Sequence, residues 1–243
     1  PKSSEEKRKS FVSIIQKSSD QLLSIVTDIL TISALETNQE KLNIEKTCIN
    51  NIVLDLLSIF KQQSTNQNIS IYTKQPLSDK LSEIYTDKTK LTQILSNLIS
   101  NALKFTHKGF IEFGYNLKNK KLEFYVKDSG IGIRADQKEK IFERFRQADL
   151  NLNKKYGGTG LGLSISKGFT ELLGGNIWVD SEINKGSTFY FTIPYNPVNE
   201  EEASINSYIP KNKPKDKPSI LIAEDEELNY LLIEEFLKDF EYI

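Results

Sequence analysis

Four glycines fall within six positions of one segment, at 157, 158, 160 and 162, directly before apolar residues with helical spacing. Glycine permits close approach to the backbone, and the free amides at the start of a helix attract anions. We therefore expect a helix over about 159–173 whose first turn binds phosphate oxygens, with residues 134–156 as a lid anchored by Phe142 and Phe145. The segment is not a Walker loop, because no Gly-Lys-Ser/Thr sequence closes it. A flexible hinge is the alternative interpretation.

A helical segment earlier in the chain, QILSNLISNALKFT at residues 93–106, has one polar and one apolar face. Asn97, Asn101 and Lys104 are spaced by four and three positions, so they project from the same side of the helix. A carboxamide oxygen suits Mg²⁺ and an ammonium group suits a phosphate, so this face fits a Mg-triphosphate. A polar face exposed to solvent is the alternative.

Two shorter motifs combine glycine with a strand-like run. In DSGIGI, Gly130 and Gly132 would let a flat ligand approach the backbone, and the Asp128 carboxylate would accept a hydrogen bond from the exocyclic amine of adenine. In KGSTF, Thr188 follows a glycine turn on a late strand. The alternatives are a simple turn for the first motif and a β-hairpin for the second.

Short extended runs alternate with longer helical ones between residues 42 and 193. The expected strands cover residues 42–49, 69–73, 110–117, 122–126, 176–181 and 187–193. The other expected helices cover about 50–63 and, capped by Thr86 or Asp87, the stretch up to residue 105. Helices and a mostly antiparallel sheet in this order predict the α+β class, as a two-layer α/β sandwich.

The two ends of the chain differ from this middle part. Over residues 11–32, apolar or small residues recur at steps of four and three, which predicts a long helix that packs lengthwise against other helices. An amphipathic helix lying on its own domain is the alternative. Residues 196–218 have the composition of a linker. Residues 219–243 start a new unit, in which Glu224 and Asp225 follow a short apolar strand.

Composition excludes several classes of function. The net charge of −1 gives no field that would attract nucleic acid. A single cysteine, Cys48, excludes an intrachain disulfide and a cysteine-based zinc site. No apolar run approaches the ~20 residues that span a bilayer, so we expect a membrane anchor only outside this chain. Because the chain has no Met and begins at Pro1, we expect a piece of a longer protein.

In order and spacing, NLISNALKF, DSGIGI, IFERF, GGTGLGL and GSTF resemble the asparagine, glycine and phenylalanine boxes of sensor histidine kinases, over about residues 10–194. The resemblance implies the ATP-binding sandwich that these kinases share with type II topoisomerases, ninety-kilodalton heat-shock chaperones and mismatch-repair ATPases. It also implies ATP and Mg²⁺ as cofactors, and Asn97, Asn101 and Lys104 as catalytic residues.

The roles follow position by position from this resemblance. Asn101 would bind Mg²⁺, Asn97 and Lys104 would contact phosphates, and Asp128 would anchor adenine. The full nucleotide-binding set that it implies is Asn97, Asn101, Lys104, Asp128, Gly130, Gly132, Ile133, Gly158, Thr159, Gly160, Leu161, Gly162, Leu163 and Thr188.

The ends resemble the same kinases. Residues 1–40 resemble the second helix of the dimerisation and histidine-phosphotransfer hairpin, 41–195 the catalytic domain, 196–218 a linker and 219–243 the start of a receiver domain. In a complete receiver, Glu224 and Asp225 would bind Mg²⁺. The implied partners are a second copy through the bundle helix, and the protein's own hairpin and receiver.

Three functions fit the sequence. The first is the cytoplasmic part of a membrane-anchored bacterial hybrid kinase, with its phosphate acceptors outside this chain, because the one histidine, His107, lies in the wrong element. The second is a degenerate kinase domain that senses nucleotide or dimerises. The third is an ATPase of the topoisomerase or chaperone type. In such ATPases a Glu four residues before the Mg²⁺ ligand activates water. Here that position is Asn97, which cannot act as a general base.

Overall fold

The structure is a computed structural model, and it describes residues 2–145 and 160–198. All of these residues belong to the first compact unit of the chain, Pro1–Ile205. The helices are α1 (Lys2–Glu36), α2 (Ile49–Asn66), α3 (Asp79–Ser82), α4 (Lys88–Phe105) and α6 (Gly162–Leu172), with 3₁₀ turns η1 (Ala135–Gln137) and η2 (Lys140–Phe142). The strands are β1 (Glu45–Cys48), β2 (Ile69–Lys74), β3 (Glu83–Thr86), β4 (Gly109–Lys118), β5 (Lys121–Asp128), β6 (Ile177–Glu182) and β7 (Gly186–Pro194).

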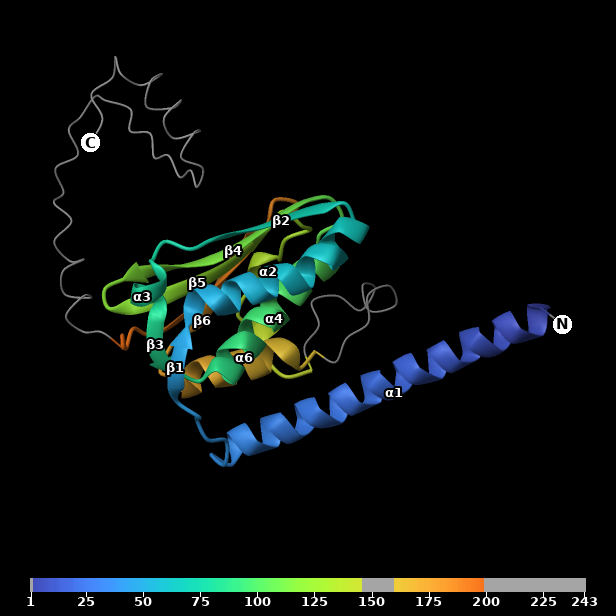
Figure 1. Cartoon of the computed structure of the whole chain (residues 1–243), viewed down its shortest axis with the longest axis horizontal. Helices are drawn as coiled ribbons and strands as arrows, with labels where there is room; N and C mark the ends of the chain where they lie inside the picture. The colour runs from blue at the N-terminus through green and yellow to red at the C-terminus, as the bar shows by residue number, and fades with distance from the viewer. Residues whose placement is uncertain (1, 146–159, 199–243) are drawn as a thin grey trace, which may run out of the picture. The chain divides into compact units, whose positions relative to one another are not determined.

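Five strands form the main sheet in the order β2-β4-β5-β7-β6. Only β2 and β4 run parallel, and the other neighbours are antiparallel. Side chains alternate between the two faces of a strand, so Ile111, Phe113 and Tyr115 of β4 all point to one face and are fully buried. Helices α2, α4 and α6 cover that face (Figure 1). The predicted two-layer α/β sandwich is therefore confirmed.

Helix α4 lies at the centre of the helical layer. Asp87 caps its first turn, because one carboxylate oxygen, Oδ1, accepts a hydrogen bond from the Lys90 backbone amide at 2.9 Å. Its buried apolar residues are Leu91, Ile94, Leu95, Leu98, Ile99, Ala102 and Leu103. Burial of each large aliphatic side chain contributes roughly 1.5–3 kcal/mol. The apolar face thus fixes the helix and leaves its polar face available for other contacts.

A second, smaller sheet pairs β1 with β3. The predicted strand over 42–49 is shorter in the structure, since Leu42 packs against the core and α2 begins at Ile49. Strand β3 and helix α3 were not predicted, because four residues each are too few to show a periodic pattern. Residues 196–198, expected to begin the linker, pair with β3 through the bonds Tyr85 N to Asn196 O and Val198 N to Glu83 O, both 2.9 Å.

Helix α1 is longer than the predicted 11–32 and exposes much of its apolar face. Phe11 is 64% exposed, Leu23 67% and Leu30 64%. Towards its end, Ile32 and Leu35 pack against the core cluster. No helix in the described part of the chain is both long and apolar enough to cross a membrane. The predicted receiver start, with Glu224 and Asp225, lies outside the described residues.

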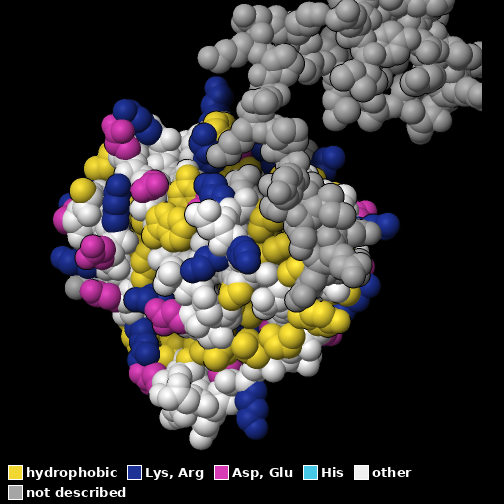
Figure 2. Space-filling model, turned by 90° about the vertical axis from the view of Figure 1, so that its left-hand side faces the viewer, with side chains coloured by type: hydrophobic (Ala, Val, Ile, Leu, Met, Phe, Trp, Pro, Cys, Tyr) yellow, Lys and Arg dark blue, Asp and Glu magenta, His cyan; other side chains and the backbone are white. Residues whose placement is uncertain are grey.

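The surface has no dominant charge on the face shown in Figure 2. Lysine and arginine side chains alternate there with acidic ones, and small apolar patches lie between them. This pattern agrees with the nearly neutral net charge of the chain. A broad basic surface, which a phosphate backbone would require, is not visible on this face.

Candidate functional site

The Asp128 carboxylate lies at the end of β5, on the face of the sheet that the helices cover. It is only 6% exposed, and its Oδ1 accepts a hydrogen bond from the Gly130 amide at 2.8 Å. Burial raises the pKa of Asp128, and the backbone amides of Gly130 and Ser187 partly oppose this rise. No salt bridge neutralises this carboxylate among residues 2–145 and 160–198. The site therefore offers a desolvated acceptor that suits a neutral donor such as an amine.

The loop after Asp128 packs tightly against its neighbours. A Cβ on Gly130 would lie 2.4 Å from the Phe105 carbonyl oxygen, at the end of α4. Gly132 has φ +70°, and a Cβ there would lie 2.0 Å from the Glu182 carbonyl oxygen. The sequence predicts that these glycines let a ligand approach the backbone. The structure adds a second role, because neighbouring backbone occupies the space that a Cβ would need at both positions, and the glycines thus permit the packing that places Asp128 beside α4.

Asn97 joins α4 to the first turns of α6. Its Nδ2 donates to Ser166 Oγ at 2.7 Å, and a Cβ on Gly162 would lie 2.4 Å from its Oδ1. Gly162 is thus needed for the close approach of the two helices. The buried Ser166 was missed by the sequence analysis, although its position one helical turn after Gly162 places it on the same side of α6.

Asn101 and Lys104 lie on the same face of α4, one and two turns further along. Both are half-buried. Within the described residues, the Asn101 carboxamide makes no hydrogen bond, so its oxygen can serve as a ligand. Burial lowers the pKa of Lys104, whose ammonium nitrogen lies 5.0 Å from the centre of the Phe105 ring. The predicted cluster of three polar side chains is therefore present on one helix face.

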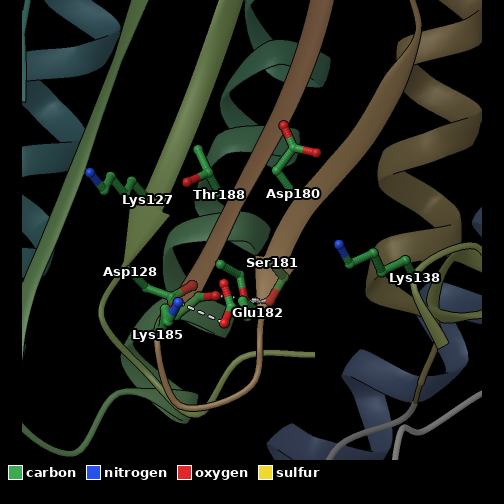
Figure 3. Close-up of a pocket in the computed structure, with 10 residues that line it drawn as sticks. Lys127, Asp128, Lys138, Asp180, Ser181, Glu182, Lys185 and Thr188 are labelled. Carbon is green, nitrogen blue, oxygen red and sulfur yellow. Dashed lines mark hydrogen bonds and ion pairs between the residues drawn. The ribbon is translucent and has the colours of Figure 1, made fainter. Parts of the chain in front are cut away.

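The Thr188 side chain lies on the opposite face of the sheet from that of Asp128, because Thr188 pairs with Lys127 and Asp180. Both Asp128 and Thr188 nevertheless line one shallow depression of about 340 Å³ (Figure 3). Ser187, the neighbour of Thr188, pairs directly with Asp128, is buried, and bonds through Oγ to Ser181 Oγ at 2.9 Å. The residue of the GSTF motif that lies next to the buried carboxylate is thus Ser187. Alternation along the strand could have shown this.

Other predicted residues contribute through their backbone. Ile133 donates its amide to Ser181 Oγ at 2.8 Å, and its side chain packs against the core, as does that of Leu163. Leu161 is fully buried, and Gly160 has φ +71°. Gly158 and Thr159 lie outside the described residues. Among the described residues, Gly160 and Gly162 at the start of α6 offer a ligand their backbone groups.

The two phenylalanines that were expected to anchor the lid differ in their surroundings. Phe142 packs edge-on against Phe189, with ring centres 6.3 Å apart. Phe145 is 67% exposed, so among the described residues its side chain is not held by burial as that of Phe142 is. Its φ of +56° is unusual for a bulky residue, because the left-handed region crowds the Cβ against the backbone.

Together these residues form a site with two chemically different ends. Asp128 is a hydrogen-bond acceptor at the end of β5, while Asn101, Lys104 and the start of α6 suit anionic groups and a hard cation. No group of three or more His, Cys, Asp or Glu side chains occurs among the described residues that could hold a metal by itself. A Mg²⁺ ion would therefore need oxygens from its ligand as well as from Asn101.

Three comparisons with known proteins agree with this geometry. Residues 86–197 match the family described as histidine kinase-, DNA gyrase B- and HSP90-like ATPases. The autoinducer 2 sensor kinase/phosphatase LuxQ of Vibrio vulnificus (strain YJ016) is 36% identical over 241 residues, which are 95% of this chain and 28% of LuxQ. This chain thus spans little more than a quarter of that relative.

Solved structures give the same result. ShkA, crystallised at full length with AMPPNP, is 29% identical with a TM-score of 0.70, over 78% of this chain and 39% of ShkA. The catalytic domain of the histidine kinase ThkA is 30% identical with a TM-score of 0.55, over 64% of this chain and 99% of that domain. The chain therefore belongs to the sensor histidine kinases and contains their ATP-binding catalytic domain.

Proposed function

We propose that this chain binds Mg-ATP and supplies its γ-phosphoryl group to a histidine of a two-component signalling protein of the hybrid type. The observation that carries the proposal is the contact of Asn97 with Gly162 and Ser166. It brings the asparagine-rich face of α4 to the N-terminus of α6, where free backbone amides favour phosphate oxygens.

Each end of the site has its own task in this proposal. Asp128 accepts the exocyclic amine of adenine, and its lack of a neutralising cation in the described structure favours this over an ionic ligand. Lys104 and the amides that open α6 bind phosphate oxygens. Asn101 contributes an oxygen ligand to Mg²⁺, which offsets the negative charge of the transferring group. Asn97 orients the start of α6 through Ser166.

Transfer to a histidine is favoured over hydrolysis by the chemistry at this junction. Helix α4 contains no acidic residue, and the only one in α6 is Glu171, near its far end. A carboxamide cannot take a proton from water near neutral pH, so water attack on the γ-phosphoryl group is not assisted from these helices. The group is left for a better nucleophile, the neutral imidazole of a histidine.

The exposed apolar face of α1 supports a partner helix in the proposed assembly. Leucine and phenylalanine side chains left in water along a helix favour association with another apolar helix. We assign this face to a dimer of the kinase and to the helix that contains the acceptor histidine. A receiver domain after residue 218 would take the phosphoryl group next, and the whole unit would lie on the cytoplasmic side, where ATP is available.

A reconstitution tests the proposal. The chain is mixed with Mg-ATP and a separately prepared acceptor hairpin from the same full-length protein, and phosphate on the hairpin is measured. We expect acid-labile phosphate on its histidine, and none on this chain alone. Sustained phosphate release without the hairpin would show an ATPase instead. Absence of ATP binding in calorimetry would show a degenerate domain.

The metal ligand has its own test. Asn101→Ala should weaken binding of Mg-ATP about tenfold or more, because one oxygen ligand of the cation is lost. The same variant should bind ATP without Mg²⁺ nearly as the wild type does. Ser100→Ala changes the neighbouring, exposed position of α4 and is the control. Equal Mg-ATP affinity of the two variants would remove Asn101 from the site.

A further inference from the structure

The chain enters and leaves the ATP-binding domain beside the first turn of α4. Residues 37–44, called the α1 linker below, connect α1 to β1, and β1 pairs with β3. On the other edge of β3, residues 196–198 leave the domain, bonded through Tyr85 and Glu83. Strand β3 ends at Thr86, and the next residue, Asp87, caps α4.

Asp87 uses both carboxylate oxygens at this junction. Oδ1 accepts from the Lys90 amide at 2.9 Å and so caps α4, while Oδ2 accepts from the Asn43 amide at 2.8 Å. The residue is 2% exposed, so neither bond is exchanged cheaply for one with water. A single buried side chain therefore joins the entering linker to the helix that contains Asn97 and Asn101.

A second contact holds the linker on the same turn. Lys90 forms an ion pair with Glu40, and its ammonium nitrogen lies 4.8 Å from the centre of the Phe169 ring of α6. The Lys90 side chain is 14% exposed and that of Glu40 is 23% exposed, so solvent screens the pair only in part. The Lys90 ammonium group thus contacts residues of both the α1 linker and α6.

We propose that Asp87 is a positioning residue that couples the α1 linker to the nucleotide site through the capped first turn of α4. The proposal rests on the assignment of Asn97 and Asn101 to ATP. Asn97 lies ten residues after Asp87, about 15 Å along a helix whose buried face resists bending. Displacement of the linker therefore reaches the site as movement of α4, and nucleotide binding orders the linker in return, because such coupling is reciprocal.

The bond between linker and cap can be broken from either side. Asp87→Ser keeps an oxygen that caps α4 but removes the second acceptor for Asn43. Asn43→Pro removes the donor and leaves Asp87 intact, while Asn43→Ala keeps the donor and is its matched control. If Asp87→Ser does not fold stably, the comparison of Asn43→Pro with Asn43→Ala still tests the proposal.

Hydrogen exchange of the whole chain, with and without Mg-AMPPNP, measures the coupling. In the wild type and in Asn43→Ala, the analogue should slow exchange of residues 38–44 about fivefold or more. In Asp87→Ser and Asn43→Pro this response should be lost, although calorimetry shows affinities within about threefold of the wild type.

Three outcomes distinguish the proposed coupling from the proposed function. Binding of the analogue to the wild type without any change in residues 38–44, or an unchanged response in both broken variants, would overturn the coupling alone. Failure of the analogue to bind the wild type would overturn the proposed function, and the coupling with it.

Discussion

The ATP-binding domain buries a carboxylate, whereas helix α1 exposes leucines. Asp128 is 6% exposed at the end of β5, while Leu23 of α1 is 67% exposed. Each arrangement costs stability in the chain by itself, because burial disfavours a charge and water disfavours an apolar side chain. The proposed function would offset both costs, since adenine would contact Asp128 and a partner helix would cover the apolar face of α1. The domain thus loses stability through a buried charged group, and α1 loses it through exposed apolar side chains.

The largest effect on stability is expected from a change in the buried face of α4. The side chains of this face pack in the core and have no proposed contact with a ligand or a partner. Leu98 is fully buried, so Leu98→Ala should lower the free energy of unfolding by about 2–5 kcal/mol. Chemical denaturation measures the change. A loss of less than about 1 kcal/mol would mean that α4 is not the centre of the core.

Asp128→Asn should improve stability while it impairs binding. Burial raises the pKa of Asp128 in the folded chain, so the charged form destabilises the fold at neutral pH and the cost disappears below about pH 4, where the carboxyl is protonated in both states. We expect a higher melting temperature than the wild type at pH 7, no difference at pH 3.5, and an ATP affinity about tenfold weaker or more. Tight ATP binding by this variant would contradict the adenine assignment.

Gly168→Ala tests the place where the two regions meet. A Cβ there would lie 2.7 Å from Leu35 Cδ1, so the Leu35 side chain must shift, while α6 gains about 1 kcal/mol of helix propensity. Thermal unfolding of the domain should therefore change by less than about 1 kcal/mol, with faster hydrogen exchange near Leu35. Lys167→Ala, at the exposed neighbouring position, should leave the exchange of α1 unchanged.

Leu23→Ala should have the smallest effect on the fold. Its side chain is largely in water already, so the free energy of unfolding of a dilute sample should stay within about 0.5 kcal/mol of the wild type. In the full-length protein the same change should weaken association through α1, which sedimentation measures. An equal loss of domain stability and association would place Leu23 in the core instead.

The sequence predicted most of the long elements, because a periodic pattern needs length. The sandwich, its antiparallel sheet and the polar face of α4 all follow from runs of five residues or more. Strand β3 escaped prediction, since its four residues form a strand only by pairing with β1 and with residues 196–198.

Prediction of individual site residues from motifs has a similar limit. Asp128 and Asn97 were predicted from motifs, and both stay predictions as site residues. The motif did not single out Ser187, because a motif does not state which strand face a side chain occupies. For Gly130 and Gly132, the sequence did not show the packing role that the structure adds. Their close neighbours, the carbonyls of Phe105 and Glu182, are far away in sequence and are known only from the fold.

The isolated bridge that residues 196–198 form with β3 has a practical consequence for anyone who shortens this protein. A chain cut after residue 195 would remove two backbone bonds from β3 and leave its edge unpaired. Open strand edges pair with those of other molecules, so such a fragment should aggregate although every predicted nucleotide-binding residue is present. The useful boundary of the domain lies at or beyond Val198.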